Sequence, residues 1–273
     1  MGGPALPAIR PTAVAGSFYS ADAAELRSEI DDLLGSTVSA APIAKALIAP
    51  HAGYIYSGPI AAAGYRRLAP ARERIMRVVL FGPSHFVGFD GLAASSAEDW
   101  QTPLGTVPVD RPMVERLIKA KLIGVLDAAH AQEHSLEVHL PFLQVALDEF
   151  ALVPIVAGDA SPQAVVALLD AVWAGPETLI VVSTDLSHYL DYRSCQATDC
   201  QTAAAIERLD PGGLGPQSAC GRVPMRGLLA AAKRRGMSIV RLDLRNSGDT
   251  AGPRNRVVGY GSWALFEPAG KQP

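Results

Sequence analysis

Short runs of strand-forming residues constrain the fold of this chain more strongly than any other feature of its sequence. Several of them are continuously apolar and do not alternate with polar residues, which is typical of strands covered on both faces. The runs expected to form strands are 46–49, 77–81, 152–156, 179–183, 239–244 and 257–260.

The segments between these runs carry apolar residues at helical spacing. In the segment 23–34, Leu26, Ile30, Leu33 and Leu34 fall on one stripe of a helix. Strands that alternate with helices along a whole chain favour a sheet with helices on both faces. We therefore expect an α/β fold, a three-layer α/β/α sandwich with a central, largely parallel but mixed sheet. The expected helices are 23–34, 112–121, 134–147, 162–173, 201–209 and 224–235.

The domain organisation follows from chain length and from the continuity of the sequence. A chain of 273 residues is long enough for two average domains, but α/β folds of this length are often single domains. No repeat, low-complexity tract or interior linker divides the sequence. We therefore predict one domain over residues 1–273, with a core from about 8 to 267 and a loose C-terminal tail, Glu267–Pro273.

Composition and charge limit which molecules the chain is expected to bind and in which compartment it is expected to work. The chain has 24 Lys and Arg residues against 27 Asp and Glu residues, so its net charge of −3 favours neither nucleic acid nor an anionic membrane. No apolar stretch reaches the ~18 residues of a membrane span, and the N-terminus lacks a signal-peptide pattern. The three cysteines are an odd number, which favours a reducing compartment, and we expect a cytoplasmic protein.

Histidines follow three of the predicted strands within five residues: His51, His85 and His188. Ligands of open α/β sheets bind beyond the carboxyl ends of parallel strands, so these side chains are expected to converge there. A single loop histidine is most often a surface or hydrogen-bonded residue, but three at equivalent positions predict a functional site.

Asp185 lies three residues before His188, directly after the same predicted strand. We expect Asp185 to orient the His188 imidazole and to raise its pKa, which would suit the pair to acid–base chemistry. The alternative is that Asp185 caps a helix and that His188 is a bystander.

Histidines at a sheet edge suit a metal site, because two imidazoles with a carboxylate or thiolate bind iron, copper or zinc. The sequence offers two candidates for the third ligand, Asp185 and Cys220. Cys220 precedes Gly221 and a segment of helical character, and a thiol at a helix start is expected to have a lowered pKa. The alternative for Cys220 is an inert buried thiol. Cys195 and Cys200 have no second pair to complete a zinc site and are expected to be structural.

The segment 133–139 is close to the pattern of zinc metalloproteases. Those patterns are H-E-x-x-H or H-x-x-E-H, whereas this segment has H-x-x-E-x-H. Five helical residues turn His139 about 140° away from His134, so a regular helix cannot direct both at one metal. His134 and Glu137 share a helix face, and we expect His134 to support the site without ligating the metal. His139 and His130 are expected to be ordinary surface residues.

Signatures of other enzyme classes are incomplete. The segment Gly82–Phe86 matches G-x-S-x-G except that Phe86 replaces the last glycine, so Ser84 is expected to be a turn residue. The sequence contains neither a G-x-G-x-x-G motif nor a P-loop. The tyrosines near His51 and His188 are expected either to pack in the core, which is favoured for Tyr65, or to wall a pocket for an aromatic substrate. They are Tyr54, Tyr56, Tyr65 and Tyr189.

Five blocks of the sequence carry a family resemblance: PHAGYIYSG at 50–58, GPSH at 82–85, EHSLEVHLP at 133–141, STDLSHY at 183–189 and CG at 220–221. In this order they resemble the Memo family, whose bacterial and archaeal members are also called AmmeMemoRadiSam system protein B. Each block alone is a weak signal, but five in order are specific. The resemblance runs from Arg10 to Tyr260 and so covers nearly the whole chain.

The resemblance implies the fold of the class III extradiol dioxygenases, which are non-haem iron enzymes that open catechol rings. By the matching motifs, His51 and His85 correspond to two metal ligands and His188 to the acid–base histidine. Cys220 stands where the dioxygenases have a glutamate ligand. Family members are described as binding iron or copper through such a set, with a redox role. Eukaryotic members bind phosphotyrosine-containing receptor segments.

The thiolate makes this implied site softer than that of a dioxygenase, which favours copper(I), zinc or a thiolate-bound iron. Ring-opening activity therefore does not carry over with the fold. Three functions stay open: an oxidoreductase acting on dioxygen or an aromatic small molecule, a peptide- or ligand-binding signalling module with a vestigial cleft, and a copper- or iron-handling protein. The completeness of the metal motifs favours metal binding, and the mild acidity of the chain disfavours a phosphopeptide partner.

Overall fold

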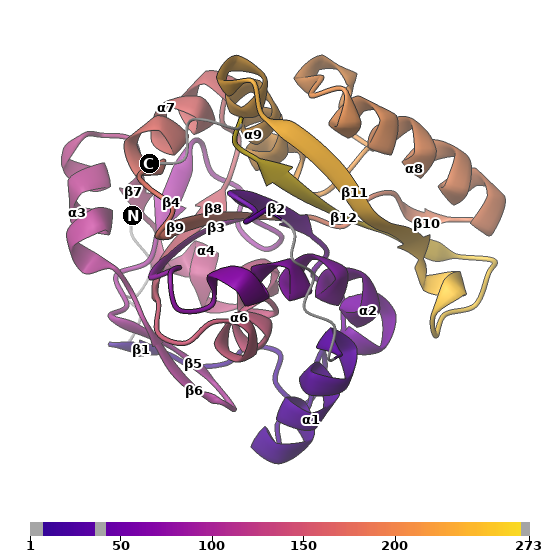
Figure 1. Cartoon of the computed structure of the whole chain (residues 1–273), viewed down its shortest axis with the longest axis horizontal. Helices are drawn as coiled ribbons and strands as arrows, with labels where there is room; N and C mark the ends of the chain where they lie inside the picture. The colour runs from indigo at the N-terminus through magenta and orange to yellow at the C-terminus, as the bar shows by residue number, and fades with distance from the viewer. Residues whose placement is uncertain (1–7, 36–41, 269–273) are drawn as a thin grey trace.

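The computed structural model describes residues 8–35 and 42–268, and Figure 1 shows the course of the chain. The strands are β1 (Ile9–Arg10), β2 (Ala46–Ala49), β3 (Arg77–Pro83), β4 (Leu92–Ala94), β5 (Asp99–Thr102), β6 (Gly105–Pro108), β7 (Gly124–Val125), β8 (Ala151–Ala157), β9 (Thr178–Ser183), β10 (His188–Leu190), β11 (Ser238–Asn246) and β12 (Val257–Phe266). The helices are α1 (Ala23–Leu34), α2 (Tyr54–Tyr65), α3 (Arg111–Lys119), α4 (Asp127–Ala131), α5 (His134–Glu137), α6 (Leu140–Ala146), α7 (Pro162–Val172), α8 (Tyr192–Glu207) and α9 (Arg222–Arg235). Short 3₁₀ helices are η1 (Arg66–Ala71), η2 (Pro211–Gly213) and η3 (Ser247–Asp249).

The main sheet has a parallel centre, and the strands that flank this centre, β12 and β4, run antiparallel to it. In the described part of the chain it has nine strands, in the order β10-β12-β2-β9-β3-β8-β4-β7, with β11 paired to β12. The central strands β2, β9, β3 and β8 run parallel, whereas β12 is antiparallel to β2. Every residue of β2 and β9 is buried, as expected for strands covered on both faces. The predicted α/β fold with a mixed sheet is therefore confirmed.

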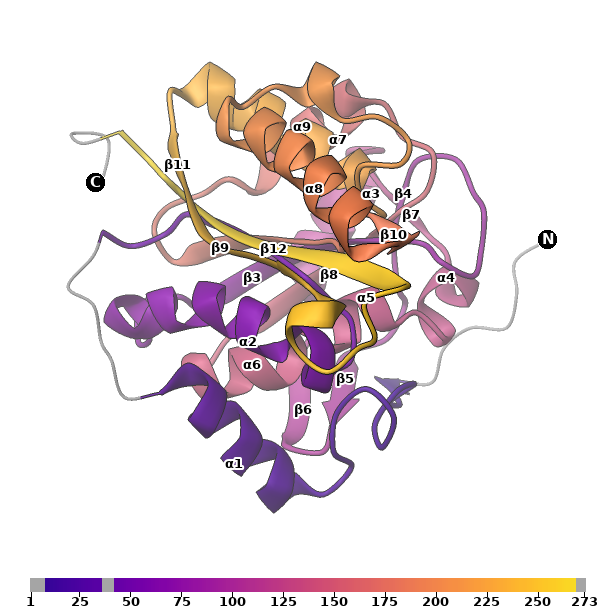
Figure 2. The same cartoon turned by 90° about the vertical axis from the view of Figure 1, so that its right-hand side faces the viewer.

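Helices cover both faces of this sheet. Figure 2 shows α7, α8 and α9 above the sheet and α1, α2 and α6 below it. Local signals in the sequence fix several helix ends: the Asp22 side chain accepts the first N–H groups of α1, and Ser161 caps α7 in the same way. Helix α1 has the bounds that its apolar stripe predicts, and it buries Leu26 and Ile30. The three-layer sandwich agrees with the prediction.

Three helical regions differ from the prediction. Helix α8 begins at Tyr192, well before the predicted segment 201–209, because the Asp191 side chain caps it by accepting the N–H groups of Arg193 and Ser194. The segment 134–147 forms two short helices, α5 and α6, because Pro141 lacks an N–H for the preceding turn and is suited to a helix start. Helix α2 was not predicted, because Gly58, Pro59 and Gly64 weaken the helical signal. A Cβ atom on Gly64 would lie 2.9 Å from the Ser262 hydroxyl of β12, so the glycine lets this helix approach the sheet.

The last described residues lie beside the end of α7. The Trp173 indole donates a hydrogen bond of 2.8 Å to Glu267, so the first residue of the predicted loose tail is held in place. The rest of that tail from residue 269 onward lies outside the described residues. In the two described stretches, none of the helices combines the length and apolar character needed to cross a membrane.

Candidate metal centre

The carboxyl ends of three neighbouring strands bring the predicted site residues together. Strands β2, β9 and β3 are adjacent and parallel, so the loops that follow them meet at one edge of the sheet. His51 follows β2, Asp185 follows β9 and His85 follows β3. These residues, with His134 and His188, line a cleft of about 540 Å³. The expectation that the strand-end histidines share one cleft is met.

His51, His85 and His134 form a tight cluster in this cleft. One ring nitrogen from each histidine lies within 4.8 Å of the other two. The ring centroid of His51 lies 5.2 Å from that of His85 and 5.5 Å from that of His134. The rings of His85 and His134 stack on each other with a centroid distance of 4.8 Å. His134 was expected to support the site without ligating a metal. Because α5 is one turn long and begins at His134 beside the cleft, its nitrogen is instead as close as those of the two predicted ligands.

Hydrogen bonds donated by the Nδ1 atoms fix the tautomers of His51 and His85. The Ser183 hydroxyl donates to the Ser135 carbonyl at 2.6 Å, so it accepts from Nδ1 of His51 at 2.5 Å. The Glu133 carboxylate accepts from Nδ1 of His85 at 2.8 Å and from the His85 backbone N–H at 2.6 Å. Both arrangements place the proton on Nδ1 and the lone pair on Nε2, as in metal sites whose histidines are held by a carboxylate or hydroxyl.

Glu133 is a site residue that the motif analysis did not single out. It is buried, and it also caps α5 by accepting the Ser135 N–H at 2.9 Å. Burial opposes the ionisation of Glu133, but hydrogen bonds from the ring and backbone of His85 and from the Ser135 N–H outweigh this effect, and the pKa of Glu133 falls to about 2. The only signal for Glu133 in the sequence is its place as an acidic residue directly before the helix that begins at His134.

Two imidazoles of the cluster, those of His51 and His134, favour the neutral form. Burial lowers the pKa of His51 well below its usual value, and the neighbouring His85 and His134 lower it further. Burial also lowers the pKa of His134. A metal needs the lone pair of a neutral imidazole, so the lowered pKa values of His51 and His134, the Nδ1 hydrogen bonds of His51 and His85 and the spacing of the three nitrogens fit iron, copper or zinc.

Cys220 lies beside His51 and outside the three-nitrogen cluster. Its Sγ is 3.4 Å from Nε2 of His51 and accepts the Asp185 backbone N–H at 3.2 Å. Burial, with the nearby Asp185 carboxylate, raises the pKa of the Cys220 thiol to about 12. The expected lowering of this pKa is therefore wrong, because the effect of burial exceeds any favourable effect of the start of α9 at Arg222. Cys220 was expected to share the cleft of the histidines, but with Arg222 it lines a neighbouring hollow of about 620 Å³.

The expected pairing of Asp185 with His188 is also wrong. The Asp185 carboxylate accepts the backbone N–H groups of His51, at 2.9 Å, and of Ala52, so it holds the loop after β2. Burial raises the pKa of Asp185 to about 7. Burial also lowers the pKa of His188, contrary to the expected increase. His188 still lines the cleft, with its ring beside that of Tyr189 at a centroid distance of 5.8 Å.

His130 and His139 are buried, although the sequence suggested surface positions for both. Nδ1 of His139 lies 2.7 Å from the Tyr65 hydroxyl, and Nε2 of His130 donates to the Ala93 carbonyl at 3.1 Å. Burial lowers the pKa of His139 to about 3 and that of His130 to about 4. These two histidines are therefore neutral structural residues.

Aromatic side chains form the rim of the histidine cleft. Phe18, Tyr56 and Tyr189 line it, together with Arg256. Tyr189 is 62% exposed and has a φ of 62°, a left-handed conformation that is uncommon for a bulky residue. The Arg256 guanidinium lies over its ring, 4.3 Å from the centroid. Of the two alternatives for the tyrosines, Tyr56 and Tyr189 line the cleft, whereas Tyr54 and Tyr65 are buried in the core.

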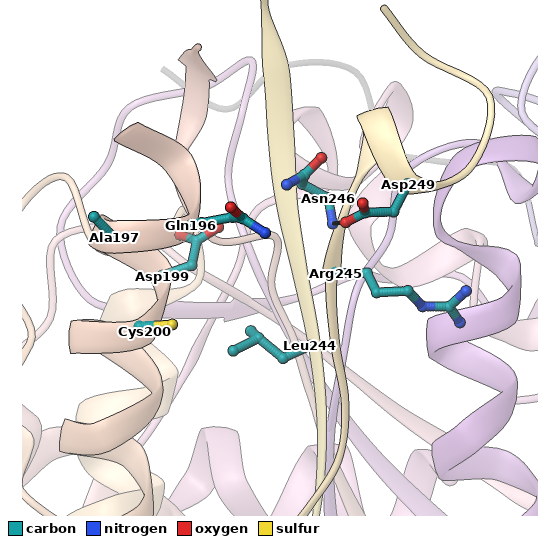
Figure 3. A pocket seen from close by; sticks show the side chains of 8 residues that line it. All are labelled: Gln196, Ala197, Asp199, Cys200, Leu244, Arg245, Asn246 and Asp249. Atoms are coloured by element: carbon teal, nitrogen blue, oxygen red, sulfur yellow. Dashed lines mark hydrogen bonds between the residues drawn. The ribbon is translucent and has the colours of Figure 1, made fainter. Parts of the chain in front are cut away.

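A second cavity, of about 430 Å³, lies between α8 and β11, apart from the histidines. Figure 3 shows the side chains of Gln196, Asp199 and Cys200 on the helix and Leu244 on the strand opposite. Cys200 is exposed, whereas Cys195 is buried and donates its S–H to Asp199 at 3.1 Å. The hydrogen bonding of Cys195 agrees with the structural role that was expected for it.

Comparisons with known proteins agree with the ordered sequence blocks. The profile of the family described as "Memo-like protein" matches residues 10–264. A MEMO1 family protein of Saccharolobus solfataricus is 34% identical, and one of Aquifex aeolicus is 36% identical; each alignment covers 92% of this chain and 97% of the relative. An uncharacterized Escherichia coli K12 protein of known structure has a TM-score of 0.46 and 15% identity, over 80% of this chain and 98% of that one. The extent and identity of the sequence matches show that the chain belongs to the Memo-like protein family.

Proposed function

We propose that the histidine cleft is a metal centre in which His51, His85 and His134 are nitrogen ligands. The observation that carries this proposal is the placement of their ring nitrogens within 4.8 Å of one another. The Nδ1 hydrogen bonds of His51 and His85 support it, because they direct the Nε2 lone pairs to ligation. Three imidazoles with an open position are a common arrangement for a catalytic metal.

Cys220 is the thiol that we propose as a further donor. The family resemblance implies a ligand set of His51, His85 and Cys220, which shares two members with the histidine cluster. The Sγ atom of Cys220 contacts Nε2 of His51, so one ion bound at His51 has both His134 and Cys220 for neighbours. Imidazole nitrogens with a thiol suit copper or iron, with zinc as the alternative.

A bound iron or copper ion would supply redox chemistry, and a small molecule in the cleft is the proposed substrate. The protein contributes the walls of the cleft and, in His188, a proton acceptor. His188 lines the cleft, and burial keeps its imidazole neutral, so it can accept a proton from a bound molecule. All three cysteines are free thiols, which suits work in the reducing cytoplasm.

A second candidate function is ligand capture without turnover. The exposed Tyr189, the Arg256 guanidinium and Tyr56 form an aromatic and cationic rim that would hold a peptide side chain or another flat ligand. In this case the cleft keeps its shape while its metal has no catalytic role. Ligand binding that is equal with and without metal would favour this candidate.

Metal content of anaerobically purified protein tests the proposal. Wild-type chains should contain one ion each, and His51→Ala or His85→Ala should abolish stoichiometric binding while the fold is kept, because little of the core is lost at a loop-built site. The variants His134→Ala and Cys220→Ser measure how much His134 and Cys220 each contribute to metal binding. His188→Ala, from the same cleft, is the matched control and should keep its metal. Unchanged metal in both the His51 and the His85 variants would refute the proposal.

A further inference from the structure

The N-terminal segment 10–19 packs against the segment 130–137, which contains Glu133 and the short helix α5 that begins at His134. Its contact begins at Arg10, which is fully buried and lies against the Trp100 ring at 4.2 Å. Nε of Arg10 donates to the His130 carbonyl at 2.8 Å, and Nη2 donates to the Glu133 carbonyl at 2.6 Å. One guanidinium therefore holds the backbone of 130–133, directly before His134.

Glu137 completes this connection from the other side of His134. Its carboxylate accepts a hydrogen bond of 2.7 Å from Nη1 of Arg10, and both groups are fully buried. It also accepts the Ala13 and Val14 backbone N–H groups at 2.7 and 3.0 Å, and the Tyr19 hydroxyl at 2.6 Å. The charge and the lone pairs of Glu137 are thus occupied by the N-terminal segment.

The same segment reaches the cleft itself. Phe18 lines the cleft, and its ring lies 4.9 Å from that of His134. The Phe18 carbonyl accepts the Tyr54 N–H at 2.7 Å, which ties the segment to the start of α2. His134 is therefore confined by Phe18 in the cleft, and its backbone lies between the two anchor points of Arg10.

We infer that Arg10, paired with Glu137, is a positioning residue for the metal centre. It fixes the segment 130–137 so that the Glu133 carboxylate meets Nδ1 of His85 and the His134 ring faces His51. A buried ion pair is a costly way to stabilise a fold, because both charges lose their hydration. The rigid guanidinium of Arg10, however, holds two backbone carbonyls and one carboxylate at once through Nε, Nη2 and Nη1. The inference rests on the proposed metal centre.

The substitution Arg10→Lys tests the inference, because lysine keeps the charge but cannot reproduce the guanidinium fork. We expect the dissociation constant for Zn²⁺, measured by competition with a chelator, to increase about 10- to 100-fold, as for other groups that hold metal ligands. The visible absorption of bound Co²⁺ should change, because it reports the coordination geometry. If Arg10 only stabilised the fold, Arg10→Lys would lower the melting temperature but leave the Zn²⁺ dissociation constant and the Co²⁺ spectrum unchanged.

Arg77→Lys is the matched control. Arg77 forms a partly buried ion pair with Asp110 at 2.6 Å, at the amino end of β3 and so far from the cleft. Its Zn²⁺ affinity and Co²⁺ spectrum should equal those of the wild type, even where its melting temperature falls. Tyr19→Phe removes one donor from Glu137 and serves as the milder variant where Arg10→Lys fails to fold; a smaller loss of affinity is expected from it.

The outcomes separate this inference from the proposed function. Wild-type protein that binds no Zn²⁺ or Co²⁺ contradicts the metal centre and, with it, the inference. Wild-type protein that binds both ions, with folded Arg10→Lys and Tyr19→Phe variants that match it in affinity and spectrum, overturns the inference alone.

Discussion

The hydrogen bonds made by Nδ1 of His51 and His85 determine what Nε2 of the same rings can bind. His51 donates from Nδ1 to Ser183, and His85 donates from Nδ1 to Glu133. Each donation leaves a lone pair on Nε2, which is the form that ligates a metal. The side chains that hold the rings are therefore as important for the metal centre as the ligands themselves.

Glu133→Gln should weaken metal binding at the candidate centre. A glutamine can present its amide N–H₂ to Nδ1 of His85, which would place the ring proton on Nε2 and block ligation. We expect the metal dissociation constant to increase about 10- to 100-fold in calorimetric titrations. Glu267→Gln, which faces Trp173 far from the cleft, should match the wild type. Equal affinities for the two variants would show that Glu133 does not fix His85.

The positions of His51, His85 and His188 could be predicted because the carboxyl ends of parallel strands share one edge. Glu133 could not be found in this way, because its contact with His85 joins residues 48 positions apart. The predicted direction of the pKa shift of Cys220 was wrong for a similar reason, because burial within the fold raises this pKa. Residue type and spacing thus locate the cleft, while the hydrogen bonds within it depend on tertiary packing.

At the scale of elements, the contact between β3 and α5 sets the place of the third histidine. Gly82 lies near the end of β3, and a Cβ atom there would be 2.5 Å from the Ser135 hydroxyl and 2.8 Å from the Leu136 side chain. Strand and helix can therefore approach closely only with glycine at this position. The turn that carries Glu133 and His134 depends on this approach.

Gly82→Ala should displace α5 and disturb the metal centre. We expect a loss of about 1–3 kcal/mol in the free energy of unfolding, from overpacking, together with weaker metal binding. Gly88→Ala is the control, because a Cβ atom there meets no atom within 4 Å, and its stability should stay within about 0.5 kcal/mol of the wild type. Denaturant unfolding and metal titration of both variants provide the comparison. A Gly82→Ala protein as stable as the control would contradict the close packing.

At the scale of the whole molecule, the main sheet joins segments that are far apart in the sequence. The alternation of strands and helices predicted the layers, because each apolar run needs cover on both faces. It could not predict the N-terminal connection, since Arg10 and Glu137 are 127 residues apart. Long-range polar contacts of this kind leave no periodic signal in the sequence.

The buried histidines make the stability of the whole chain sensitive to acid. His130 and His139 have pKa values of about 4 and about 3 when folded, against a usual value near 6.5. Between pH 6.5 and 4 the unfolded chain binds protons that the folded chain does not, so stability falls as the pH falls. Each group contributes roughly 1.4 kcal/mol per pH unit in this window.

The double substitution His139→Leu with Tyr65→Phe removes one of these groups together with its hydrogen-bond partner. Urea unfolding at several pH values from 7 to 4 should then show a shallower loss of stability than in the wild type. The single substitution Tyr65→Phe keeps His139 and should retain the steeper dependence. Identical pH profiles for all three proteins would mean that His139 does not stay neutral in the folded chain.

The most direct test of the central claim is the position of a bound ion. Anomalous X-ray diffraction from crystals of the metal-loaded protein should show one peak in the cleft, about 2.0–2.1 Å from Nε2 of His51 and of His85 in the case of zinc. His134 should be a further ligand to the same ion. A fully loaded crystal with its ion elsewhere, such as in the cavity beside Cys200, or with none bound by His51 and His85, would contradict the account.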